Sequence, residues 1–470
     1  MSDRRGFRWA TTGARLVGGT VAAAGFVVLV VTAVAAPWPT TAREPVSVQA
    51  APAPADTVVS CTGGLLALGR DARDPARLTV AAAPSVTVGT PNGAAAPPET
   101  TLSGSGALSS GGTAYTAPPE NGARVDVAAA ASAVATDDDL RGFAASACRQ
   151  PLMESWLVAG STATGSADIV LLSNPGPVPA SVELTVYGQS GPAVPPGGSD
   201  LVVPAATQIA VPLAGIALGE TAPVIRVTAT GAPVQAAMQS SLTRTLAPVG
   251  VDQAGPSAAA STDVVIPGVD VTVAPVSGAT EPTTLLRVLS PTADTTATVT
   301  ITRVGSAEPV TQPASVAIAA GVPTQVDLTG LAVGRYVVRV TAEAPLVAAL
   351  WHTTGMTEGS DFAWYTPAPP VTAASVFATV AGPAPVLSLV NPGAADAAVR
   401  VVAADGSDDQ TVTVAAGSSA SLTLDARTVY TLDPSGGTID AALSMSGDGA
   451  LAGYPVWPSA AAVPTITVYP

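Results

Sequence analysis

Apolar and polar residues alternate along most of this chain, in short runs separated by clusters of Gly, Pro, Asn and Asp. Alternation with a period of two is typical of a β-strand with one buried face. Three segments share one plan, in which an alternating run, a turn containing a proline and a second alternating run follow each other: residues 167–191, 283–307 and 384–408. The turns contain Pro175, Pro291 and Pro392. We therefore expect each segment to form a β-hairpin.

Further strand-like runs follow each predicted hairpin and bring every copy to six or seven strands in about 100 residues, which suits an immunoglobulin-like sandwich. We therefore predict an all-β protein with tandem Ig-like β-sandwich domains: repeat 1 at residues 151–245, repeat 2 at 264–354 and repeat 3 at 361–470. Residues 246–263 are expected to form a flexible linker or an extended edge. Residues 57–150 alternate less regularly and are predicted to be a β-rich region with long loops.

One stretch breaks this pattern, because residues 16–36 are uncharged and apolar without alternation. At about 1.5 Å per residue, a helix of this length crosses a hydrocarbon core of about 30 Å. Arginines precede it, at positions 4, 5, 8 and 15. The positive-inside rule therefore predicts a single-pass protein of the cytoplasmic membrane, with residues 1–15 inside as a basic tail and the bulk of the chain outside.

The alternative for this stretch is a signal peptide cleaved at the A-x-A-like sequence that ends at Ala35. Both readings put the rest of the chain outside the membrane. Residues 37–56 are rich in Pro and Ala and are expected to form an extended spacer.

Composition supports a β fold and narrows the possible partners. The 45 Gly and 44 Pro lie among Val- and Thr-rich runs, a balance that favours short strands and turns. The net charge is -15, and since residues 1–36 contribute +3, the remainder carries -18. A surface of that sign repels nucleic acid, so no nucleic-acid partner is expected. All 19 basic residues are Arg, which excludes mechanisms that need a lysine.

The two cysteines, Cys61 and Cys148, both lie in the predicted exterior part. In an oxidising compartment such a pair is expected to form one disulfide, which would close the 57–150 region. Two separate buried thiols are the alternative. The spacing excludes a CxxC redox or zinc motif.

Three segments carry a resemblance to a known family: SCTGGLLALG, ACRQPLMESWLVAGSTATGSADIVLLSNPG and LSLVNPGAADAAVRV. They resemble a family of actinobacterial envelope-anchored proteins with a domain of unknown function and repeats of the Asn-Pro-Gly type. The resemblance covers nearly all of the exterior part. It implies a tandem β-domain ectodomain, and it implies no activity, catalytic residue or ligand.

Few residues suit chemistry. The only histidine, His352, ends an alternating run and is expected to be structural or exposed. Two acidic clusters, residues 137–139 and 405–409, are interpreted as solvated turns, with weak calcium binding as the alternative. Three glutamates considered for glycoside hydrolysis are isolated from one another along the chain: Glu183, Glu308 and Glu343.

The densest group of aromatic residues comprises Trp351, Phe362, Trp364 and Tyr365. Packing between domains explains this group more simply than ligand binding, which is the alternative. We therefore predict no catalytic, cofactor-binding or metal-binding residues and no cofactor.

The expected function is that of a non-enzymatic structural or interaction protein of the cell envelope. Its partners would be the membrane, through the helix, and an envelope protein or wall glycan. The alternatives are a divergent extracellular hydrolase acting on wall glycan and a solute-binding or sensory ectodomain. A solute-binding ectodomain would need a ligand-sized pocket.

Overall fold

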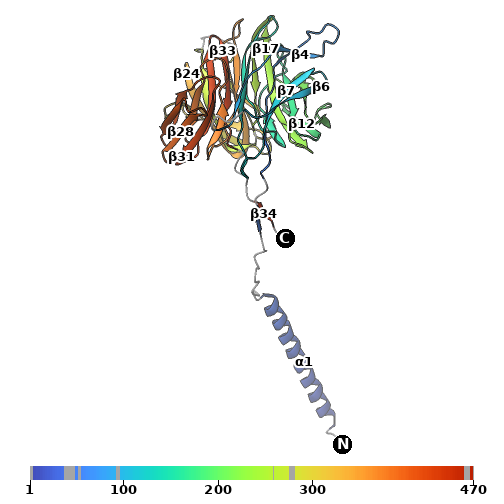
Figure 1. The fold of residues 1–470 in the computed structure, drawn as a ribbon. Helices are drawn as coiled ribbons and strands as arrows, with labels where there is room; N and C mark the ends of the chain where they lie inside the picture. The colour runs from blue at the N-terminus through green and yellow to red at the C-terminus, as the bar shows by residue number, and fades with distance from the viewer. Residues whose placement is uncertain are drawn as a thin grey trace. The chain divides into compact units, whose positions relative to one another are not determined.

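The structure is a computed structural model, which describes residues 4–35, 48–50, 54–91, 96–257, 259–274, 281–459 and 466–468. The chain forms two compact units, one of residues 1–52 with 464–470 and one of residues 53–463. Both units are drawn in Figure 1.

The first unit contains helix α1 (Arg4–Ala35) and a two-stranded antiparallel sheet of β1 (Val48–Ala50) and β34 (Ile466–Val468). The part Gly13–Ala35 is long and apolar enough to cross a membrane, with a mean hydropathy of 2.3. It overlaps the segment predicted from the sequence. The predicted spacer, residues 37–56, lies outside the described residues except for β1 and residues 54–56.

The regular secondary structure described in the second unit is almost all β-strand, which confirms the predicted all-β class, and the strands form three β-sandwiches. In sandwich 1, the first sheet has the order β10 (Glu154–Leu157), β16 (Val224–Thr230), β12 (Ala180–Gly188) and β13 (Gly191–Ala193), and β14 (Leu201–Val203) also pairs with β12. The facing sheet has the order β18 (Ala247–Ala254), β17 (Gln235–Arg244), β11 (Ile169–Asn174), β15 (Thr207–Pro212), β6 (Glu99–Ser105), β7 (Ser110–Ala117) and β2 (Thr57–Ser60).

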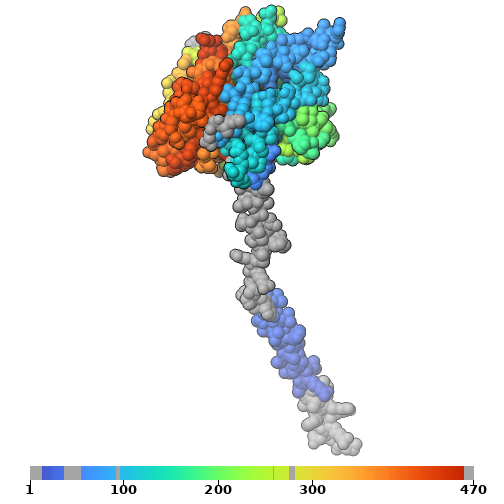
Figure 2. Space-filling model, viewed as in Figure 1, coloured from blue at the N-terminus to red at the C-terminus, as the bar shows by residue number. Residues whose placement is uncertain are grey.

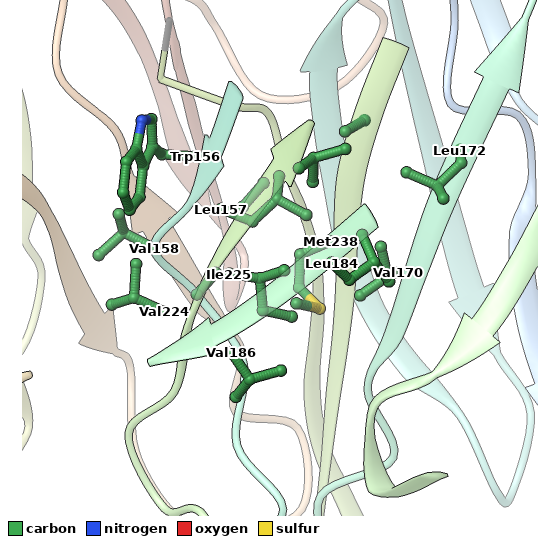
Figure 3. Close-up of a cluster of buried hydrophobic side chains, with 14 of the residues drawn as sticks. Trp156, Leu157, Val158, Val170, Leu172, Leu184, Val186, Val224, Ile225 and Met238 are labelled. Atoms are coloured by element: carbon green, nitrogen blue, oxygen red, sulfur yellow. The ribbon is translucent and has the colours of Figure 1, made fainter. Parts of the chain in front are cut away.

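Alternating side chains of the two sheets form the core of sandwich 1. Val170 on β11, Leu184 on β12 and Met238 on β17 gather between the strands, and Trp156 closes one side of the cluster (Figure 3). Each of these side chains is at most 4% exposed. At about 25 cal/mol per Å² of apolar surface, burial of this kind is the main term that holds the two sheets together.

Sandwich 2 depends on one long strand. Strand β24 (Gly334–Thr353) pairs over its first part with β19 (Ser261–Val271) and β21 (Thr295–Arg303), and over its last part with β20 (Thr284–Leu289) and β25 (Phe362–Tyr365). It therefore belongs to both sheets. Strand β22 (Ala314–Ile318) pairs with β21, and β23 (Thr324–Asp327) pairs with β20, so each forms one edge of its sheet, and β19 and β25 form the other two edges.

Sandwich 3 has two four-stranded sheets. The first has the order β26 (Ser375–Ala378), β31 (Val429–Ser435), β28 (Ala397–Ala403) and β29 (Asp409–Val414). The second has the order β30 (Ser419–Thr423), β27 (Val386–Val390), β32 (Asp440–Gly447) and β33 (Ala450–Pro455). In Figure 1, β28 and β31 lie on the opposite side of this unit from β12 of sandwich 1.

The region 57–150 contributes strands to its neighbours. Its strands β2, β6 and β7 extend a sheet of sandwich 1, as their order above shows. Two small sheets complete it, one of β3 (Leu65–Leu68) and β4 (Leu78–Ala82) and one of β5 (Ser85–Gly89), β8 (Ala128–Thr136) and β9 (Arg141–Ala147). Phe143 of β9 is buried in the core of sandwich 3. Figure 2 shows this region, in blue and cyan, covering the surface between the green and orange sandwiches.

The predicted β-hairpins are wrong. Strands β11 and β12 belong to opposite sheets of sandwich 1, and β27 and β28 belong to opposite sheets of sandwich 3. In sandwich 2, β20 and β21 pair with different parts of β24 and not with each other. The turns are therefore arches that carry the chain across the core. In the first arch, the buried amide of Asn174 donates to the carbonyl oxygens of Val178 at 2.8 Å and Val203 at 3.0 Å. Asn391 makes the matching two bonds in sandwich 3, so a side chain takes the place of hairpin backbone bonds.

The predicted linker 246–263 is also not flexible chain. It forms β18, whose residue Val251 is fully buried, and the beginning of β19. Its alternative, an extended edge, describes β18 better, because β18 is the last strand of its sheet.

Strands from four parts of the unit meet around one carboxylate. Strand β9 lies against β18 and β33, and β25 lies against the same two strands. The carboxylate of Asp361, 2% exposed, accepts the backbone N–H groups of Phe143 on β9 (2.8 Å), Val251 on β18 (3.2 Å) and Leu451 on β33 (3.3 Å), and that of its neighbour Phe362 on β25 (3.0 Å). Burial raises the pKa of Asp361 well above 3.8, while these N–H groups act in the opposite direction. Asp361 therefore joins sandwiches 1, 2 and 3 to the 57–150 region.

Candidate functional site

His352 is a structural histidine. It is fully buried at the end of β24, and burial lowers its pKa to about 4. Its Nε2 accepts the backbone N–H of Thr272 at 3.0 Å, so Nδ1 carries the proton and donates to the hydroxyl of Thr284 at 2.9 Å. Both ring nitrogens are therefore engaged within sandwich 2.

The carboxylates of the two acidic clusters pair with arginines or accept hydrogen bonds within their own turns. Arg70 forms ion pairs with Asp137 (2.7 Å) and Asp139 (2.5 Å). In the second cluster, Arg400 pairs with Asp409 at 2.7 Å, and the carboxylate of Asp405 accepts hydrogen bonds from its own turn. In the described part of the chain, no three or more His, Cys, Asp or Glu side chains are grouped so that they could share a metal ion.

The three glutamates lie on different elements and are exposed. Glu183 lies on β12, Glu308 in the loop after β21, and Glu343 on β24. The structure therefore does not place them as a pair of carboxylates across a cleft.

Cys61 and Cys148 form a disulfide across 87 positions of sequence. Backbone hydrogen bonds between Ser60 and Arg149 run beside it, so the end of β2 is held to the end of β9. The bridge lies within a small apolar cluster with Val59. It closes the 57–150 region as predicted.

A cavity of about 290 Å³ opens between sandwich 1 and sandwich 2, and it divides the predicted aromatic patch. Trp351, Phe362 and Trp364 line the cavity, whereas Tyr365 is buried in the core of sandwich 2. The ring centroids of Trp351 and Phe362 lie 6.0 Å apart, with the planes tilted by 44°. Trp351 is only half-buried, so part of its indole remains accessible. The patch thus packs between two repeats and also forms one wall of a cavity.

Two buried charged residues, Asp168 and Arg287, also line this cavity. The carboxylate of Asp168, just before β11, accepts the backbone N–H groups of Ser161 at 2.6 Å and Ser241 at 3.0 Å. Burial raises the pKa of Asp168 to about 7, although these two N–H groups and Arg287 favour its ionised form.

Arg287 lies on β20 between two core residues and points to the opposite face. It is 2% exposed, and its guanidinium lies 4.7 Å from the ring centroid of Trp364. One terminal nitrogen donates to the carbonyl oxygens of Gly160 at 2.9 Å and Pro223 at 2.8 Å. Burial lowers the pKa of Arg287 to about 9. The side chain is thus held by sandwich 1 while its backbone belongs to sandwich 2.

The buried carboxylate of Asp252 on β18 accepts the backbone N–H of Trp364 at 2.7 Å. The sequence reasoning missed this residue as well as Asp168, Arg287 and Asp361. A signal was present for Arg287, because a charged residue interrupts the apolar run LLRVL. A charge within a buried strand requires partners, so such a residue marks either an interface or a site. The missing information was the partner, which comes from another repeat.

Comparison with known families gives one match. A model described as "Family of unknown function (DUF5719)" matches residues 103–425, which is more than half of the chain. No curated protein and no solved structure matches the chain.

Proposed function

Since the chain belongs to the family of unknown function DUF5719, its function has to be argued from its own residues, and we propose that it is a non-enzymatic interaction protein of the cell envelope. Helix α1 anchors it in the cytoplasmic membrane with the N-terminus inside. The β unit, residues 53–463, lies outside and presents its sandwiches to an envelope partner.

One combination of features carries this proposal: an apolar helix of membrane-spanning length and a disulfide-bonded β unit occur in the same chain. Disulfides persist in oxidising compartments outside the cytoplasm. The arginines at positions 4, 5, 8 and 15 before the apolar stretch support an inside N-terminus.

A non-enzymatic role is supported by what the buried ionisable groups do. Asp361 receives backbone N–H groups from four strands, and His352 has both ring nitrogens engaged. Both groups thus serve packing and orientation. The charge of -18 outside residues 1–36 supports partners other than nucleic acid.

The test follows the full chain in cells from which the wall has been removed. We expect the protein to remain in the membrane fraction after an alkaline wash, and externally added protease to remove the β unit. Both cysteines should resist thiol labelling until the protein is reduced. A soluble product in the medium that begins near residue 36 would replace the anchor with a cleaved signal.

A helix variant provides the control. Two charges, Val27→Arg with Leu29→Arg, each cost about 2.5–3.5 kcal/mol at the centre of a membrane helix, so this variant should stay in the cytoplasm with labelled thiols. The apolar pair Val27→Ile with Leu29→Ile should behave as the unchanged chain. Equal thiol labelling of the two variants would contradict the proposed location.

A further inference from the structure

The cavity between sandwich 1 and sandwich 2 has two unlike walls. One is apolar and includes the rings of Trp351, Phe362 and Trp364 together with Met356. The other is polar and carries Ser161, Ser241 and the buried Asp168. A ligand that fills this space needs an apolar face and a hydrogen-bonding edge.

The polar wall has unused hydrogen-bonding capacity. Each oxygen of Asp168 accepts one backbone N–H, and a carboxylate oxygen has room for a second donor.

The charged groups of the cavity are already engaged. At the mouth, Arg244 pairs with Glu281 at 3.3 Å, and Arg287 donates to the carbonyl oxygens of Gly160 and Pro223. No cation of the lining is thus left free to select an anion. This arrangement favours a neutral ligand that both donates and accepts hydrogen bonds.

The size of the cavity sets a further limit. About 290 Å³ lies near the lower end of the roughly 300–1,000 Å³ that small-molecule sites occupy. A pyranose ring meets all of these conditions, because its C–H face is apolar and suits the face of an indole, while its hydroxyls donate and accept at the rim. The half-buried indole of Trp351 is the accessible aromatic surface in this wall.

We infer that this cavity binds one pyranose residue of a neutral glycan, with the sugar ring against Trp351 and its hydroxyls bonded to Asp168. The inference rests on the proposed function in one respect, because a β unit outside the membrane meets the glycans of the envelope. The proposed function leaves the envelope partner open, and this inference identifies it as a neutral glycan.

Binding is measured with the full chain in a polyoxyethylene detergent, since sugar-headed detergents would compete. The probes are the methyl pyranosides of glucose, galactose, mannose and N-acetylglucosamine, with neutral trisaccharides of the same sugars. Isothermal calorimetry and saturation-transfer NMR report binding. We expect at least one probe to bind saturably, and Trp351→Ala to weaken that binding at least tenfold.

Two further variants separate loss of the site from loss of the fold. Thr164 is exposed at the lining, so Thr164→Trp should fill the mouth and abolish binding with an unchanged melting temperature. The matched control is Trp457→Ala, because this half-buried tryptophan contacts Arg149 in a different part of the unit. It should change affinity less than twofold.

The inference is overturned if none of the neutral sugars binds, or if Trp351→Ala and Thr164→Trp leave the affinity unchanged. Saturation of the cavity by a charged sugar or a peptide that neutral sugars do not displace would also overturn it. These outcomes are separate from those of the proposed function. If the protein binds sugar but is found in the cytoplasm, the sugar site stands and the proposed location is refuted. If the protein lies outside the membrane but binds no sugar, the location stands and the sugar site is refuted.

Discussion

Replacement of Asp361 by Asn tests whether this carboxylate joins the parts of the β unit. Each of its oxygens accepts two backbone N–H groups, Oδ1 from Val251 and Phe362 and Oδ2 from Phe143 and Leu451. An amide keeps one oxygen and replaces the other with an NH₂ group. Two N–H donors then face a donor instead of an acceptor.

The magnitude follows from those two lost hydrogen bonds. A buried donor left without a partner costs about 1–3 kcal/mol, so Asp361→Asn should lower the free energy of unfolding by about 2–6 kcal/mol. The total stability of a domain is typically about 5–15 kcal/mol. The substitution therefore threatens the packing of the four strands around the carboxylate, while the core of each sandwich retains its apolar contacts.

The assay combines thermal unfolding of the full chain with hydrogen exchange of the affected backbone amides. We expect a lower melting temperature and faster exchange at Phe143, Val251 and Leu451, with much smaller changes in the strands at the far edges of the sandwiches. The control is Asp396→Asn, because this carboxylate accepts the N–H of Ala416 at 3.0 Å in an exposed turn. Surface changes of this kind stay within about 0.5 kcal/mol.

Equal melting temperatures for the two variants would refute the reasoning. Unchanged exchange at all three amides would do the same, because it would mean that the four strands hold together without the carboxylate.

Three further predictions concern other parts of the β unit. Leu389→Ala should lower the free energy of unfolding by about 2–5 kcal/mol through lost core packing. Ser388→Asp should lower it by a comparable amount, because Ser388 is also fully buried although it lies on the other face of the strand. A Ser388→Asp variant of unchanged stability in denaturation experiments would contradict this. Cys61→Ala removes the disulfide, whose loop closure is worth about 4–5 kcal/mol in the chain-entropy model. The backbone amides of β2 should therefore exchange hydrogen faster, while those of β32 change little. Equally faster exchange in both strands would contradict this prediction. Burial raises the pKa of Asp252 from 3.8 to about 7. The stability that its protonated form contributes is therefore fully present below pH 4 and is lost as the pH rises to about 7. The loss amounts to about 4 kcal/mol, at about 1.4 kcal/mol per pKa unit. In thermal melts at a series of pH values, Asp252→Asn should remove this loss of stability. The variant should still lose stability as the pH falls from 6.5 toward 4, because burial lowers the pKa of His352 from 6.5 to about 4.

The burial of Ser388 shows where the sequence pattern stops being informative. Alternation correctly places Leu387 and Leu389 in the core of sandwich 3, and it assigns Ser388 to an outer face. That face is covered by β19 of sandwich 2, where Gly268 approaches so closely that an added Cβ would lie 2.9 Å from the Ser388 hydroxyl oxygen. The pattern reports which side chains point to one side of a strand, and it does not report what covers the other side.

The prediction of β-hairpins was wrong for a related reason. Two alternating runs joined by a short turn are equally compatible with neighbours in one sheet and with partners across a core, because both arrangements bury every second residue. The choice depends on whether a group in the turn can replace the hairpin's backbone bonds. Asn174 and Asn391 do so here, with partners up to 29 residues away.

The sequence by itself determined the local features of this protein: the apolar helix, the strands, their inward-facing residues and the pair of cysteines that forms the disulfide. Each depends on composition or on a short repeat that neighbouring residues define. The tertiary structure alone decided which sheets the strands join, how Asp361 gathers four of them, and that Asp168, Arg287 and Trp351 line one cavity. Those features arise where distant segments pack together, and the free energy that selects them comes from surfaces that exist only once the sandwiches have formed.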